Sequence, residues 1–95
     1  MIVVVATFRA REGREQELRT TLEGLVPVTR EERGSIQYDL HVAEEDPASL
    51  LFYERWESDE ALQEHLSSPH VGAVFAIVGE LCVDAPRIDR YSLVG

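Results

Sequence analysis

The 95-residue sequence contains one cysteine, four prolines and no apolar run approaching the ~20 residues of a membrane span. Its single cysteine, Cys82, excludes an intramolecular disulfide and fits a reducing cytoplasm, which we expect as its compartment. Cationic side chains are also few, since nine basic residues face 18 acidic ones and the net charge is −9. Because such a chain repels phosphates, we expect neither nucleic acid nor a membrane surface as a partner.

Several chemical signatures are absent as well. The sequence has no phosphate-binding glycine loop, no dinucleotide-binding glycine pattern and no serine on a nucleophile elbow. Three histidines without a cysteine cluster or a His-x-x-x-His pair do not predict a metal site. What remains is chemistry without a metal or cofactor, or no chemistry at all.

Hydrophobic periodicity predicts an α+β domain spanning residues 1–95. The first half of the chain is expected to form a strand over 2–9, then a helix that begins at 14, is kinked or restarted by Pro27 and ends at Gly34, and then strands over 36–42 and 50–56. The second half is expected to form a short helix capped by Ser58, a second helix that begins at Ser68-Pro69, and a last strand over 87–94. This order is βαββαβ, the ferredoxin-like pattern, with helices on one face of an antiparallel sheet.

The first and third predicted strands are apolar or aromatic on both faces, although helices can cover only one. The uncovered face would carry Leu51, Tyr53 and half of the valines near the N-terminus. An apolar patch of this kind usually marks an interface. We therefore expect a homodimer that packs sheet to sheet.

The two histidines of the segment Tyr53–His70 are the first candidates for proton transfer. His70 stands at the second position of a predicted helix, where the positive helix end disfavours the imidazolium and favours a neutral base. His65 lies near the apolar stripe of the preceding helix. Each has a plainer interpretation: His70 hydrogen-bonds a neighbouring loop, and His65 is a half-buried rim residue.

Phe52, Glu54 and Trp56 share one strand face. If that face points to the helices, Trp56 walls a cavity and Glu54 is a buried carboxyl with a raised pKa, able to act as acid or base. The plainer interpretations are core packing for Trp56 and an ion pair of Glu54 with Arg9 or Arg87, and we favour the ion pair.

Three segments carry a resemblance to a known family: Arg30–His41, Tyr53-Glu-Arg-Trp-Glu-Ser58 and Glu64-His-Leu-Ser-Ser-Pro-His70. With this order and spacing, the chain resembles the antibiotic biosynthesis monooxygenase domain, and within it the small quinol monooxygenase-type proteins. The similarity extends over essentially all 95 residues.

The resemblance implies a dimeric α+β barrel with a cavity between each sheet and its own helices. It also implies that O₂ oxidises a small aromatic quinol or phenol without flavin, haem or metal. On this basis His70 or His65 is the expected base, Trp56 the wall and orienting group, and Glu54 the hydrogen-bonding support. Substrate binding is assigned to Tyr38, Phe52 and Phe75.

Three other functions stay open or are disfavoured by the residues present. Haem-degrading relatives use a first-strand asparagine and a last-helix histidine, where this chain offers Thr7-Phe8 and Val74-Phe75, so haem degradation is not expected. An isomerase of a phosphorylated signalling molecule would need cations such as Arg9, Arg87 and Arg90. A non-catalytic, stress-associated ligand-binding dimer is the third. An apolar pocket favours a quinol, and an arginine-bearing pocket favours a phosphate.

Overall fold

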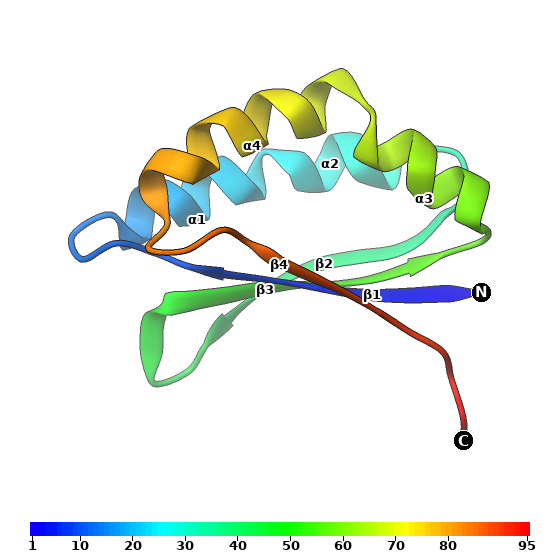
Figure 1. The fold of residues 1–95 in the computed structure, drawn as a ribbon, viewed down its shortest axis with the longest axis horizontal. Coiled ribbons are helices and arrows are strands. Elements are labelled where there is room, and N and C mark those ends of the chain that lie inside the picture. Colours follow the sequence, from blue (N-terminus) through cyan, green and yellow to red (C-terminus); the bar gives the residue numbers. More distant parts are fainter.

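Four strands form one antiparallel sheet, and every helix lies on the same side of it in the computed structural model, which describes residues 1–95 (Figure 1). The elements are β1 (Ile2–Arg9), α1 (Glu15–Glu23), α2 (Leu25–Arg30), β2 (Ser35–Ala43), β3 (Asp46–Trp56), α3 (Asp59–Leu66), α4 (Pro69–Leu81) and β4 (Arg87–Tyr91). The strand order is β2-β3-β1-β4. The predicted ferredoxin-like α+β fold is confirmed.

The core lies between the sheet and the helices. Pairing of β1 with β3 sets Val4 opposite Glu54 and Ala6 opposite Phe52, so alternate residues of both strands face the helices. Leu18 and Leu22 of α1 fill the space above them and are fully buried. Burying one such side chain contributes about 1.5–3 kcal/mol, which is why the apolar stripe fixes the orientation of α1.

The first helical region breaks at Gly24 and not at Pro27. The amide of Gly24 bonds to the carbonyl of Thr20, and α2 begins at the next residue. Pro27 then falls in the first turn of α2, where a missing amide costs no hydrogen bond. The longest helix, α4, has 13 residues, and no helix is both long and apolar enough to cross a membrane.

Two strand ends differ from prediction. β3 begins at Asp46, in the predicted turn, because the Asp46 carboxylate accepts a 2.8 Å bond from Arg9 and one from the amide of Ala48. β4 ends at Tyr91, and Leu93 and Val94 beyond it are 84% and 98% exposed. This tail points away from the sheet on the side opposite the helices (Figure 1).

The predicted alternation in β2 is interrupted at Ile36. The register with β3 shifts between Ser35 and Gln37, which leaves Ile36 as an unpaired extra residue, 44% exposed. Tyr38 follows the bulge, pairs with Glu54 and faces the helices as expected. Strict alternation would place Ile36 on the same face as Tyr38, but the bulge turns it toward solvent.

The sheet face away from the helices is covered by no element (Figure 1). The register places Val3, Val5, Leu51 and Tyr53 on it, each half-buried only by its neighbours in the sheet. The prediction that apolar residues of β1 and β3 remain uncovered is therefore confirmed.

Gly34 fixes how the connection between α2 and β2 meets α3. Its φ is +85°, and a Cβ built there would overlap the Cβ of Ala61 in α3. The carbonyl of Gly34 also accepts a 2.8 Å bond from the amide of Glu57. Only a residue without a side chain allows this approach.

Gly34→Ala should therefore destabilise the fold by about 3 kcal/mol or more, from backbone strain plus the clash with Ala61. The matched control is Gly13→Ala, which has φ +84° but open space around its Cβ, and should lose only about 1–2 kcal/mol. Urea denaturation of both variants measures the difference. Equal losses would show that the contact with Ala61 contributes nothing.

Candidate functional site

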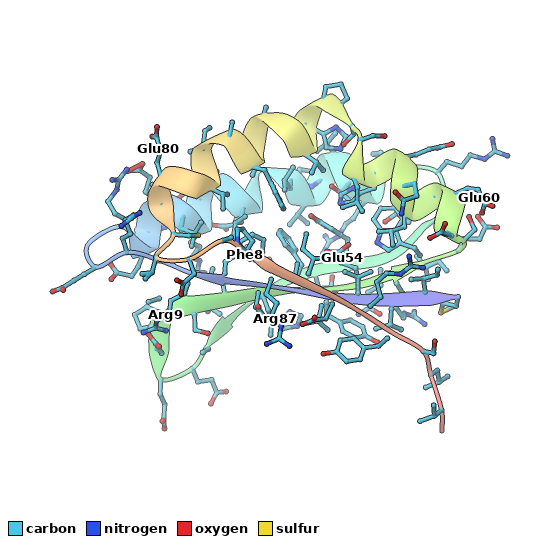
Figure 2. All side chains as sticks on the ribbon, in the orientation of Figure 1. Phe8, Arg9, Glu54, Glu60, Glu80 and Arg87 are labelled. Atoms are coloured by element: carbon cyan, nitrogen blue, oxygen red, sulfur yellow. The ribbon has the colours of Figure 1, made fainter.

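Glu54 lies two residues before the end of β3 and points from the sheet toward the helices (Figure 2). It is 4% exposed, and its Oε1 accepts a 2.9 Å hydrogen bond from the indole Nε1 of Trp56. Burial raises the pKa of Glu54 to about 7, helped by the nearby charge of Glu32 and opposed by the indole hydrogen bond. Glu54 is therefore buried on the helix side of the sheet, as expected if that face of β3 points to the helices.

The expected ion pair of Glu54 with Arg9 or Arg87 is wrong. Both arginines lie on the other side of the sheet (Figure 2), because odd-numbered residues of β1 and their partners in β4 face away from the helices. The three arginines considered for phosphate binding each pair with an aspartate: Arg9 with Asp46 at 2.8 Å, Arg87 with Asp89 at 2.8 Å and Arg90 with Asp59 at 3.0 Å.

Two histidines and a glutamate meet where α3 ends and α4 begins. Glu32 Oε1 lies 2.8 Å from His65 Nδ1 and 2.8 Å from His70 Nε2, and Glu32 Oε2 lies 3.2 Å from His65 Nδ1. We call these three residues the histidine–glutamate cluster. A single carboxylate thus joins both predicted candidate bases, although Glu32 was not among the predicted site residues.

The helix break that brings the histidines together is built by Ser68 and Pro69. Ser68 Oγ accepts from the amide of Val71, which caps α4, and its hydroxyl donates to the carbonyl of His65 at 2.6 Å. Pro69 occupies the first position of α4, where no amide is needed. His70 is therefore held at the second position of α4, as predicted, next to the last turn of α3.

His65 is 3% exposed and so is fully buried, unlike the half-buried rim residue considered above. Burial lowers its pKa, although the hydrogen bond and charge of Glu32 oppose this shift, so the imidazole is neutral near pH 7. A carboxylate only accepts hydrogen bonds, so Nδ1 carries the single ring proton of His65. This tautomer leaves Nε2 as a proton acceptor.

Aromatic rings surround His65. Its ring centroid lies 4.6 Å from that of Trp56 and 5.4 Å from that of Tyr38, and Tyr38 stacks on Phe52 at 4.4 Å. Burial and the charge of Glu54 raise the pKa of Tyr38, so its hydroxyl keeps its proton at neutral pH. The surroundings of His65 are thus dry, aromatic and able to donate a hydrogen bond.

A small cavity of about 20 Å³ lies between the sheet and the helices at this point. Glu54 and His65 are its only charged or ionisable lining groups besides the tyrosine hydroxyl, and the predicted substrate-binding residues Tyr38, Phe52 and Phe75 all line it. Trp56 and His70 do not line it: Trp56 packs behind Glu54 and His65, and His70 lies on the far side of Glu32. No arginine lines it.

Glu32 is the residue that sequence reasoning missed. It lies between Arg30 and Gly34, in a charged stretch that is typical of a solvent-exposed helix end. Its partners are 33 and 38 residues further along the chain, so no local periodicity could reveal the contact. The one available signal in the sequence was Gly34. A glycine here lets the connection after α2 approach α3 closely, and Glu32, two residues earlier in that connection, then also lies near α3.

Comparisons with known proteins give a consistent result. The family model described as antibiotic biosynthesis monooxygenase matches residues 1–76. Rv0793 of Mycobacterium tuberculosis is 39% identical over 80 residues, covering 84% of this chain and 78% of that protein, and its solved structure aligns with a TM-score of 0.92 over 99% and 95% of the two chains.

Two further relatives agree. YcnE of Bacillus subtilis is 27% identical over 86 residues, or 90% of each chain. The crystal structure of PA3566 from Pseudomonas aeruginosa is 30% identical, with a TM-score of 0.90 over 99% of this chain and 94% of that one. Rv0793 and YcnE are both named as candidate monooxygenases.

Replacing Glu54 by Gln should remove a pH dependence of stability. The folded chain holds the Glu54 proton more tightly than the unfolded chain, whose pKa is near the ordinary 4.5. The contribution of Glu54 to the unfolding free energy is therefore present in full below pH 4.5, declines as the pH rises toward about 7 and is lost above it. Gln keeps an oxygen for Trp56 Nε1 without the charge.

We expect the unfolding free energy of Glu54→Gln, relative to the wild type, to rise by about 2–3 kcal/mol between pH 5 and pH 8. Urea denaturation at several pH values measures this difference. Glu57→Gln, at an exposed position just after β3, is the matched control and should show little change. Parallel pH profiles for wild type and Glu54→Gln would contradict the burial of an ionisable carboxyl.

Proposed function

Because the chain belongs to the antibiotic biosynthesis monooxygenase family and is related to proteins named as monooxygenases, we propose that it oxidises a small quinol or phenol with O₂, without a bound flavin, haem or metal. One observation carries the proposal: a neutral, acceptor-ready His65 borders a small aromatic cavity that contains no arginine. Such a cavity suits a flat, uncharged ring and offers no ligand for a phosphate.

His65 is the proposed base. Its Nε2 accepts the phenolic proton, while Glu32 holds Nδ1 and stabilises the imidazolium that forms. The resulting phenolate gives an electron to O₂ far more readily than the neutral phenol does. The tight surroundings of His65 keep water from the reactive pair. His70 then supports the reaction from outside the cavity by fixing Glu32.

The reaction balances without an external reductant. A quinol and O₂ contain all the electrons and atoms needed to form a hydroxylated quinone and one water, since the ring supplies the four electrons that reduce O₂. One oxygen atom forms a new carbon–oxygen bond, and the other leaves as water with the two hydrogens lost from the substrate. The protein has to move protons and to position the ring.

The other side chains have supporting roles in this proposal. Tyr38 donates a hydrogen bond to the substrate, and Phe52 and Phe75 contact its ring. Glu54, anchored by Trp56, provides a second carboxyl that exchanges a proton near neutral pH. The cavity of about 20 Å³ accommodates about one water, so side chains at its edge, including the half-exposed Phe75, must move for a ring to enter.

Oxygen consumption with a panel of hydroquinones tests the proposal, using protein shown to be free of metal and flavin. His65→Asn should lower the rate by about 10²-fold or more, because the base is lost. His41→Asn is the matched control, since His41 is exposed and lies on the opposite side of the sheet from the cavity. It should leave the rate unchanged.

Isotopically labelled O₂ separates monooxygenation from simple oxidation. The proposal requires one labelled oxygen atom in the product and no hydrogen peroxide. Equal rates for His65→Asn and wild type would remove the role of the base. No turnover of any quinol would favour a non-catalytic ligand-binding domain.

We also propose that two copies pack through the uncovered sheet face. Its centre is apolar, with Val3, Val5 and Leu51, whereas its margins on β2 and β4 are polar, as in many protein interfaces. Cys82 is a buried free thiol, which suits the reducing cytoplasm we propose as the compartment.

Sedimentation at micromolar concentration should give twice the mass of the chain. Leu51→Arg, at the apolar centre, should shift the mass to that of one chain, because a charge buried in the interface is costly. His41→Arg, the neighbour of Leu51 on β2 at the polar margin, should stay dimeric. A wild-type chain that sediments as a monomer would end the proposal.

A further inference from the structure

Three atoms of the types that bind metals converge at the histidine–glutamate cluster. His65 Nδ1, His70 Nε2 and a carboxylate oxygen of Glu32 all lie within 4.8 Å of one another. They come from three separate parts of the chain: the connection after α2, the last turn of α3 and the first turn of α4. Two imidazoles and one carboxylate are the donor set of several catalytic zinc sites and of non-haem iron sites.

We propose that the histidine–glutamate cluster binds one divalent transition-metal ion, for which Zn²⁺ is the first probe. Metal bonds of about 2.0–2.2 Å place neighbouring ligand atoms about 2.8–3.1 Å apart around an octahedral ion and about 3.3–3.6 Å apart around a tetrahedral one. The nitrogen–oxygen separations here are 2.8 Å to each histidine and 3.2 Å from the second Glu32 oxygen to His65. These separations match the octahedral spacing at 2.8 Å and lie close to the tetrahedral one at 3.2 Å.

Access and charge both favour a cation at this place. The side chains of His65, Glu32 and His70 are 4%, 17% and 28% exposed, so an ion can enter from the side of His70 and keep water on its open positions. Glu32 lies near enough to Glu54 for its charge to help raise the pKa of that carboxyl, and the whole chain carries a net charge of −9. This negative field raises the local cation concentration.

Metal binding has a consequence for His65 that rests on the proposed function, whereas the binding itself does not. An ion takes the Nδ1 lone pair, so the one proton of the neutral ring must reside on Nε2. No net proton is released, but the nitrogen that would receive the phenolic proton is then occupied. His65 therefore cannot bind the ion and act as the base at the same time. For this reason the ion inhibits the reaction.

Isothermal titration of chelator-treated protein with Zn²⁺ tests the binding. Wild type and His41→Asn should each bind one equivalent with the same affinity, since His41 is exposed and outside the cluster. Glu32→Gln and His70→Asn should each bind about 10-fold more weakly or worse, because each loses a ligand. Circular dichroism confirms that the variants are folded, and Co²⁺ in place of Zn²⁺ should give visible absorption only where the cluster is intact.

Two results would overturn the metal site: no heat of binding to the wild type, or equal affinity in all four proteins, which would place the ion on exposed acids elsewhere. Quinol turnover is measured separately. One equivalent of Zn²⁺ should lower it about 10-fold or more, with recovery after chelation. Binding without any turnover contradicts the proposed function alone, turnover without binding contradicts the metal site alone, and binding that leaves turnover unchanged contradicts the inhibition.

Discussion

The carboxylate of Glu32 is the point on which the site depends. It accepts hydrogen bonds from His65 and His70, and so ties the connection after α2 to the break between α3 and α4. Gly34, two residues later, makes that approach sterically possible by leaving room for Ala61. Without this contact, nothing would select the His65 tautomer whose free nitrogen serves as a base.

A second carboxyl, that of Glu54, is buried and lines the same cavity as His65. Glu54 is held by Trp56, and its pKa near 7 reflects burial rather than an ion pair. Keeping this group dry costs stability whenever it is ionised, a cost that a purely structural position would avoid by carrying an apolar side chain. Two carboxyls with different surroundings around one imidazole are typical of sites that move protons.

Much of the fold was predictable because local rules decided it. The β-branched apolar run of β1, the apolar stripe of α1 and the Ser68-Pro69 start of α4 each specify one local structure, and the structure has all of them. The errors occurred where tertiary contacts override local preference. The bulge at Ile36 and the start of β3 at Asp46 depend on pairing between strands, and Asp46 is fixed by an arginine 37 residues away.

The sequence by itself determined the fold class, the face of β3 that carries Glu54 and Trp56, and the position of His70 in its helix. These follow from periods and caps that act over a few residues. Only the tertiary structure decided that Glu32 joins both histidines, that His65 and not His70 borders the cavity, and that Glu54 has no arginine partner. The reason is physical: hydrogen bonds and burial depend on distance in space, and the residues concerned are more than 30 positions apart along the chain.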